Sequence, residues 1–322
     1  MTTTPDLGAL FGSGNIETFM GIERCDDLDR LSSPIAIIGA PAATPYRSVG
    51  AYCAGGPKAI RHGMAAFAAN LDHYDFDLGG PLFPDPSTAA VDYGDLDYDE
   101  GDAPANRKAI HDAVSTTLKR GSVPIVIGGD DSIPIPVLQA FAGRGTFTIL
   151  QIDAHIDWRD VVDGERYGLS STMRRASEMD HIDSIVQAGQ RGLGSARQAD
   201  REDAKAWGAE LISARDFHHF GIKQVLQHVP ASADVIISID CDALDPSIMP
   251  GVIGRAPGGL WYGQIVDLLT AVASRSRIAG LALVEFMPER DVDGIGALTA
   301  GRLVATAMGL IARQVKGSIA KA

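Results

Sequence analysis

The stretch 146–157, TFTILQIDAHID, joins an apolar run to a cluster of acidic residues and one histidine. Its apolar part is nearly continuous and rich in β-branched residues, which is typical of a strand buried on both faces of a parallel sheet. Similar runs end in glycine, aspartate or arginine at five other places, namely 34–41, 123–131, 184–192, 234–242 and 278–286. Together these runs predict the parallel strands of an α/β fold.

Stretches long enough for crossover helices lie between the predicted strands, at 57–69, 105–119, 134–142, 196–207, 220–228, 262–274 and 297–315. This alternation of strands and helices predicts a doubly wound parallel sheet with helices on both faces. No gap between the apolar runs is long enough to require a second core. We therefore expect a single domain over residues 1–322, with residues 1–32 as an N-terminal extension packed on it.

The composition narrows the range of partners. The chain has 322 residues, of which 28 are basic and 41 acidic, so its formal net charge is −13. Nucleic acids and anionic membranes attract positive surfaces, and this charge argues against both as the main partner. The hydrophobic content of 45% is that of a globular protein. No apolar run reaches the ~18 residues that a membrane span needs.

The cysteines and the N-terminal sequence point to the cytoplasm. Cys25, Cys53 and Cys241 are odd in number and widely spaced, so they suggest neither a zinc pair nor a disulfide framework. The sequence MTTTPDLGALFG lacks the basic and apolar regions of a secretory signal. We expect a cytoplasmic protein.

Two of the predicted strands end in closely spaced acidic residues. In an open parallel sheet, ligands bind beyond the carboxyl ends of the strands. Asp153, His155 and Asp157 follow one strand, and an extended chain would project all three to the same side. Asp240 and Asp242 end another strand at the same spacing of two residues. Such groups repel one another unless something positive lies between them, and a divalent metal ion meets that need.

Two further acidic residues end predicted strands, with an alternative explanation for each. Asp131 lies in GGDDS (128–132), where Asp130 or Ser132 would serve equally well as the cap of a following helix. Glu285 ends the run 278–286 and is as readily a cap or an ion-pair partner. Taken together, the oxygen-rich group with one imidazole favours hard or borderline cations such as Mn²⁺. Carboxylates close enough to bridge favour two ions about 3.5–4 Å apart.

At this point the motifs resemble a known family. DAHID (153–157), SIDCDALDP (238–246) and the strand that ends in Glu285 resemble the three signatures of the ureohydrolase (arginase/agmatinase) family. GGDDS stands where that family usually has GGDHS. ETFMGI (17–22) and TPYRSVGAYCAGGPKAIR (44–61) resemble the N-terminal segment and the substrate-side loop of agmatinases. The resemblance implies a three-layer αβα arginase-like fold with a mostly parallel eight-stranded sheet.

The resemblance also implies a binuclear centre of two divalent ions, most often Mn²⁺, with Ni²⁺ as the alternative. Asp153 and Asp240 would bridge the ions. The six ligands carried over from the family motifs are Asp131, Asp153, His155, Asp157, Asp240 and Asp242. Such proteins usually assemble as trimers or hexamers. A homo-oligomer is expected, and a hetero-oligomer with a related subunit is the alternative.

The implied reaction is the cleavage of a guanidino C–N bond. A metal-bridging hydroxide attacks the guanidine carbon, and the intermediate collapses to an amine and urea or a substituted urea. The resemblance makes Glu285 the partner of the substrate guanidinium, and Asp157 the group that passes a proton to the leaving nitrogen. The expected partner is a small cationic guanidino compound, which the acidic chain attracts.

Two departures from the family pattern bear on this reading. Asp131 replaces the usual histidine ligand and adds one negative charge, which favours Mn²⁺ over Ni²⁺. Many agmatinases carry a proton-shuttling histidine after DAHxD, and Leu169 or Ser170 stands in its place here. Ser170 and Ser171 are then candidates for contact with the substrate.

These departures leave three functions open. The first is an amidinohydrolase that acts on a guanidino acid, guanidine itself or a biguanide. The second is a non-catalytic or helper subunit of a heteromeric ureohydrolase, such as a guanidine or metformin-type hydrolase. The third is a hydrolase of a formimino or other amidine bond.

Overall fold

A single parallel sheet forms the centre of the protein, for which the computed structural model describes residue 10 and residues 16–319. Nine strands lie in the order β1-β3-β2-β4-β9-β8-β5-β6-β7, and every neighbouring pair is parallel. The strands are β1 (Glu23–Arg24), β2 (Ile35–Ala40), β3 (Ala90–Asp95), β4 (Val123–Gly128), β5 (Phe147–Ile152), β6 (Ile182–Gln190), β7 (Glu210–Ser213), β8 (Asp234–Asp240) and β9 (Arg277–Val284).

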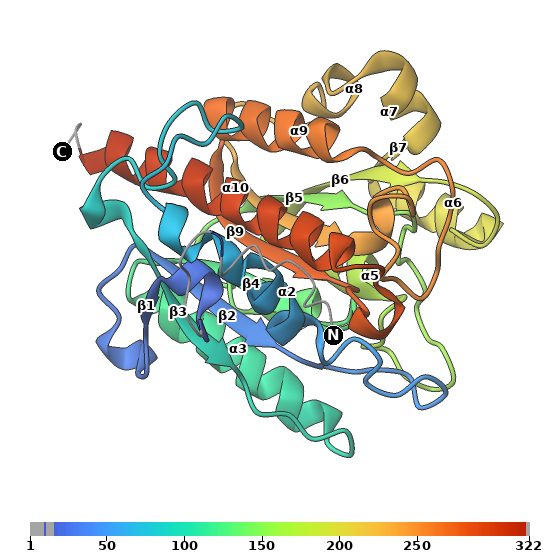
Figure 1. Ribbon diagram of the computed structural model, residues 1–322. Helices are drawn as coiled ribbons and strands as arrows, with labels where there is room; N and C mark the ends of the chain where they lie inside the picture. The colour runs from blue at the N-terminus through green and yellow to red at the C-terminus, as the bar shows by residue number, and fades with distance from the viewer. Residues whose placement is uncertain (1–9, 11–15, 320–322) are drawn as a thin grey trace, which may run out of the picture.

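Helices cover both faces of this sheet. One face packs against α2 (Gly56–Met64), α7 (Ala214–Phe220), α8 (Lys223–Leu226), α9 (Tyr262–Arg275) and α10 (Ile295–Ile319). The other packs against α3 (Ala103–Lys119), α4 (Pro134–Gln139), α5 (Thr172–Ala176) and α6 (Gln198–Trp207). Figure 1 shows α9 and α10 lying across the front of the sheet. The result is the predicted three-layer αβα arrangement.

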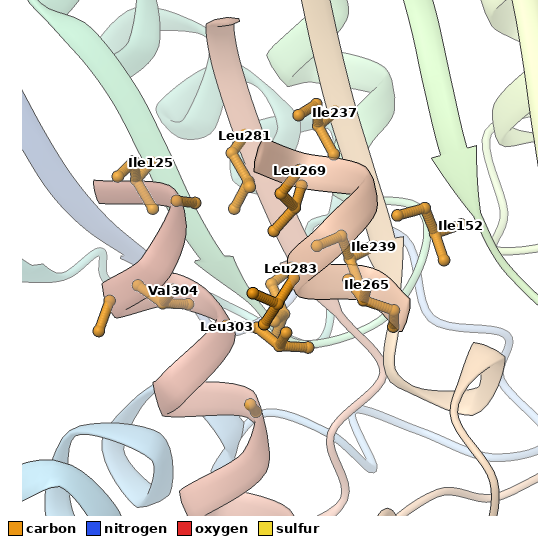
Figure 2. Close-up of a cluster of buried hydrophobic side chains, with 14 of the residues drawn as sticks. Ile125, Ile152, Ile237, Ile239, Ile265, Leu269, Leu281, Leu283, Leu303 and Val304 are labelled. Atoms are coloured by element: carbon orange, nitrogen blue, oxygen red, sulfur yellow. The ribbon is translucent and has the colours of Figure 1, made fainter. Parts of the chain in front are cut away.

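Two hydrophobic cores explain why the strand sequences are almost continuously apolar. On β4, Ile125 and Ile127 join the core under α9 and α10, whereas Val126 joins the core on the opposite face. Figure 2 shows the first of these cores, where side chains of the central strands meet Leu269 of α9 and Leu303 of α10. Because successive strand residues point to opposite faces, a strand buried on both faces needs apolar residues at every position.

Helix α10 is long and apolar, but its surroundings are protein. By length and composition, Ile295–Gly317 has what a membrane span requires. Yet 83% of that window is buried inside the protein, where α10 packs against α2 and α9. The apolar character of this helix is that of a core helix.

The sheet differs from the prediction in its number of strands. The six predicted runs correspond to β2, β4, β5, β6, β8 and β9, and the parallel α/β sheet is confirmed. The sheet has nine strands rather than eight, and the two-residue β1 on its edge comes from the chain segment before residue 32. The runs did not reveal β1, β3 or β7, because β1 and β7 are short and β3 (AVDYGD) contains two aspartates.

Two predicted helices also need correction. Where one helix was expected over 220–228, α7 ends at Phe220 and the separate, short α8 spans Lys223–Leu226. The helix predicted at 57–69 is α2 up to Met64 and then a 3₁₀-helix over Ala65–Asn70. The predicted extension 1–32 lies partly outside the described residues. In its described part, Phe19 is fully buried and β1 pairs with β3.

Candidate metal centre

The predicted ligands meet because four strands that are far apart in the sequence are neighbours in the sheet. The central order is β4, β9, β8 and β5. Asp131 follows β4, Glu285 follows β9, Asp240 ends β8 and Asp153 follows β5. All four side chains are buried. Parallel strands end at the same edge of a sheet, so this order brings the four carboxylates to one place.

The DAHID segment reaches the site through a turn rather than an extended strand. Strand β5 ends at Ile152, and Asp157 has a φ of 46°, which aspartate tolerates better than most residues. The chain is therefore not extended over 153–157 as expected, although Asp153, His155 and Asp157 do come together. The Gln151 side-chain amide donates to Asp153 Oδ2 and to Asp157 Oδ2, both at 2.6 Å. These two hydrogen bonds fix the two carboxylates relative to each other.

A second turn orients the acids after β8. The Asp240 carboxylate accepts a hydrogen bond of 2.7 Å from the Asp242 backbone N–H and so caps the 3₁₀-helix Cys241–Ala243. Asp242 Oδ1 accepts from the Ala154 N–H at 3.2 Å, which links this turn to the DAHID segment. The spacing of two residues thus serves a helical turn, in contrast to the extended strand end that was predicted.

Two groups of side chains have the geometry of metal ligands, and they share one residue. Asp153, His155 and Asp242 offer ligand atoms within 4.8 Å of one another, as do Asp131, Asp153 and Asp240. His155 Nδ1 lies 3.1 Å from Asp242 Oδ2 and 3.4 Å from Asp153 Oδ1. Asp153 therefore lies between two adjacent positions for a cation.

The protein leaves Asp131 and Asp240 without a compensating positive charge, whereas His155 pairs with Asp153 and Asp242. Both carboxylate oxygens of Asp131 are buried without a hydrogen-bond partner. Burial, followed by repulsion from Asp157 and Asp153, raises the pKa of Asp131 well above its usual value. Burial and Asp242 likewise raise the pKa of Asp240. Within the described residues, no lysine or arginine forms an ion pair with the four aspartates of the two ligand groups or with Asp157.

Glu285 has a different environment from the aspartates. Its φ of 66° turns the chain sharply after β9, and its backbone N–H donates to Gly129 O at 2.6 Å. Its carboxylate accepts hydrogen bonds from the Tyr52 hydroxyl at 2.6 and 2.7 Å and from the Asp131 N–H at 2.9 Å. Burial nevertheless raises the pKa of Glu285 to about 8. A cation beside it would restore the charged form.

A cavity of about 500 Å³ opens onto this cluster. Its wall includes Trp158, Leu169, Ser170 and the acids of the cluster other than Asp153. The structure separates the two predicted substrate serines, because Ser171 is fully buried at the start of α5 and is not part of the wall. A direct contact between Ser171 and a substrate is not supported. Leu169 and Ser170, the two candidates for the position of the family's shuttling histidine, both line the cavity.

The sequence model of the arginase family matches residues 33–309. The chain belongs to the arginase family. The resemblance to the ureohydrolase family that was seen in the sequence is confirmed by this match.

Curated relatives and a solved structure place the chain among several members of the arginase family. It is 33% identical over 216 residues to the N(1)-aminopropylagmatine ureohydrolase of Thermus thermophilus. The aligned region covers 65% of this chain and 70% of that protein. It is 35% identical over 187 residues to arginase 1, mitochondrial, of Arabidopsis thaliana, over 56% of this chain. The match spans only 53% of the length of that arginase. The structure of proclavaminate amidino hydrolase from Streptomyces clavuligerus superposes with a TM-score of 0.77 at 26% identity, covering 94% of this chain and 98% of that one.

Two residues of this arginase-family chain support the site and were not singled out from the sequence. Tyr52 holds Glu285 across 233 positions of sequence, a contact that no local pattern reveals. Gln151 was visible as the one amide inside the apolar run TFTILQI. A buried polar side chain in a strand needs hydrogen-bond partners, and that requirement was the available signal. Gln187, on the neighbouring β6, donates to Gln151 Oε1 and to Ile156 O and so holds Gln151 in turn.

Proposed function

We propose that this arginase-family protein is a metal-dependent hydrolase that cleaves a guanidino C–N bond to give an amine and urea or a substituted urea. The observation that carries the proposal is the pair of ligand groups that share Asp153. Glu285 follows strand β9, which lies between β4 and β8, and it lines the cavity of about 500 Å³ beside the ligand groups. A binuclear centre and a carboxylate for the guanidinium are the two parts that this reaction requires.

The side chains present fit two divalent ions. Five carboxylates and one imidazole favour Mn²⁺ first and Ni²⁺ second. Asp131, whose two oxygens lack any protein partner, supplies ligand atoms that nothing else uses. The proposed ligands are Asp131, Asp153, His155, Asp157, Asp240 and Asp242. When bound, the ions would lower the pKa of a shared water molecule and thereby supply the nucleophile.

The chain's own residues position the substrate and handle the proton. Glu285, held by Tyr52 and by the Asp131 N–H, would pair with the guanidinium, and the positive charge would keep Glu285 ionised. Asp157, which the Gln151 amide orients through Oδ2, would take a proton from the attacking water and pass it to the leaving nitrogen. Trp158, which is 2% exposed and packs against Trp207, helps to keep water from the cavity wall.

The proposal extends to assembly and location. A homo-trimer or homo-hexamer follows from the family resemblance, and light scattering of the purified protein tests it. The three cysteines are free, which supports a reducing compartment such as the cytoplasm.

The decisive experiment combines metal analysis with product detection. Purified protein is loaded with Mn²⁺ or Ni²⁺, its metal content is counted, and a panel of guanidino compounds is tested for release of urea or substituted urea. We expect two ions per chain and urea from at least one compound. Two bound ions with no urea from any compound would contradict the proposal. Release of ammonia or formamide instead would identify a hydrolase of formimino or amidine bonds.

A helper subunit of a heteromeric ureohydrolase is the second candidate. It is favoured by Asp131 at the position of the usual histidine and by Leu169 facing the cavity. Less than one ion per chain, with activity restored only by a related partner chain, would support it. The Asp131→His variant sharpens the test. A helper chain would gain metal with this change, whereas an enzyme adapted to Asp131 already holds two ions without it.

A further inference from the structure

The cavity has opposite charges in two places. Its acidic residues are deeply buried, with Asp131 at 2% and Asp240 at 3% exposure. Arg159 and Arg197 line the same cavity, and their side chains are 36% and 56% exposed. The arginines therefore lie on the solvent-facing side of the cavity and the acids at its floor.

Asp200 pairs unequally with these two arginines. Arg197 donates to both oxygens of Asp200, from Nε at 2.7 Å and from a terminal nitrogen at 2.6 Å. This bidentate pair uses the acceptor capacity of Asp200 toward arginine in its preferred geometry. Arg159 Nε remains 4.0 Å from Asp200 Oδ2, beyond hydrogen-bond distance. Arg159 thus keeps only a distant ion pair with Asp200 and no hydrogen bond to it.

The Arg159 guanidinium also lacks other acceptors. Its Nε is buried without a hydrogen-bond partner, and its terminal nitrogens donate to no residue in the described part of the chain. Its backbone is held, because the Arg159 N–H donates to Ser170 O at 2.9 Å on the cavity wall. A guanidinium whose donors have no hydrogen-bond acceptor beside a cavity is suited to an anion, and above all to a carboxylate.

From these observations we infer that the substrate is a guanidino acid, whose guanidinium meets Glu285 and whose carboxylate binds Arg159. The inference rests on the proposed function and names the substrate class of the same site. A substrate with an amine tail would meet the Arg159 charge and find Asp200 already paired. An alkylguanidine with an uncharged tail would leave the Arg159 donors unpartnered. The acid alone satisfies both charged ends of the cavity.

The first test compares substrates of matched length on the metal-loaded protein. The three compounds are 4-guanidinobutanoate, agmatine and butylguanidine. Each has a guanidinium on a four-carbon chain, and the other end is an acid, an amine or an uncharged methyl group. Butylguanidine is called the neutral compound because its tail is uncharged. Guanidinoalkanoates with two to five carbons extend the series. We expect kcat/KM for the best acid to exceed that of its neutral counterpart by about 10- to 100-fold, as hydrogen bonds to a charged group provide. Equal rates for the acid and the neutral compound would overturn the inference.

The second test removes or reverses the charge. Arg159→Gln is expected to lower kcat/KM for the acid by about 10- to 100-fold and to leave the neutral compound nearly unchanged. Arg159→Glu is expected to reverse the preference toward agmatine. Arg166→Gln is the matched control, because Arg166 is exposed, pairs with Glu178 and does not line the cavity. Equal losses for all three compounds in Arg159→Gln would show a merely structural role.

A binding measurement separates this inference from the proposed function. Calorimetry on the metal-loaded protein measures the affinity of the three compounds without any need for turnover. Tighter binding of the acid that is lost in Arg159→Gln, with no urea formed, would support the Arg159 assignment and contradict the proposed hydrolysis. Turnover of all three compounds at equal rates, with equal affinities, would leave the hydrolysis standing and overturn the assignment.

Discussion

Asp92 on β3 and Asp131 after β4 are both buried aspartates, but their surroundings differ. Asp92 accepts hydrogen bonds from Arg61 Nε at 2.7 Å and from Arg61 Nη2 at 2.8 Å. The backbone N–H groups of Phe19 and Gly94 complete its shell at 2.7 and 2.9 Å. Asp131, in contrast, has two carboxylate oxygens without any partner.

This difference distinguishes structural charge from functional charge. A buried carboxylate is tolerated when protein groups pair with it and satisfy its oxygens. Around Asp92 the chain provides those groups itself, and the result anchors Phe19 and α2 to the sheet. Around Asp131 the chain provides further acids instead. A cluster of that kind must bind a cation or take up protons, which is why it marks the candidate site.

The largest expected effect comes from Asp153, the residue common to both ligand groups. Asp153→Asn is expected to abolish tight metal binding and to lower activity by more than about 100-fold, since even residues behind the ligands typically cost 10- to 100-fold. Metal counting and urea release measure both effects. Asp112→Asn, an exposed aspartate on α3, is the control. Two tightly bound ions in Asp153→Asn would contradict the assignment of the centre.

The opposite outcome is expected at the paired cluster. Asp92→Asn leaves the buried Arg61 without its main partner, so the free energy of unfolding should fall by about 3–5 kcal/mol. Denaturant titration measures this loss. The variant should still bind two metal ions when folded. A loss of metal binding at unchanged stability would show that the two clusters are not separate in function.

Removal of metal should affect only the unpaired cluster. For the wild-type protein, at a metal concentration of about 100 times Kd, chelation should cost about 2.7 kcal/mol of stability. Thermal unfolding with and without a chelator measures this change. The same chelator should not alter the melting temperature of Asp153→Asn. An equal shift in both proteins would mean that the ions stabilise the fold elsewhere.

The smallest effect is expected behind the ligands. Gln151→Met removes the amide that holds Asp153 and Asp157 and keeps a side chain of similar length. Metal affinity should fall by about 10- to 100-fold, measured by competition with a chelating dye. Gln198→Met is the control, since Gln198 is exposed and bonds only Glu202. Unchanged affinity would show that the turn at Asp157 holds the carboxylates without Gln151.

Much of the fold was predictable because it depends on local patterns of apolar and acidic residues. Continuous apolar runs predicted β2, β4, β5, β6, β8 and β9, since strands buried on both faces have no polar face. The acids at their ends predicted where ligands would gather. Strand β3 was not predicted because its sequence contains the buried Asp92. Asp92 breaks the apolar pattern, and only its pairing with Arg61, 31 positions away, allows its burial.

The local geometry of the site was less predictable than its composition. The spacing of two residues in DAHID and in SIDCD was read as strand alternation, and the structure has turns at both places. In a turn, a hydrogen bond such as that from Asp242 N–H to Asp240 sets the direction of a side chain, and strand periodicity no longer applies. Residue type and order were therefore reliable, while orientation was not.

By itself the sequence determined a parallel α/β fold, the arginase-family motifs and an excess of acid at the strand ends, because these depend on residues that are close together in the chain. The tertiary structure decided which acids meet. It placed β4, β9, β8 and β5 side by side and left Asp131 unpaired while Asp92 is paired. It also bound Asp200 closely to Arg197, so that Arg159 keeps only a 4.0 Å ion pair with Asp200. Compensation of charge depends on distances in space, and residues far apart in the chain set those distances.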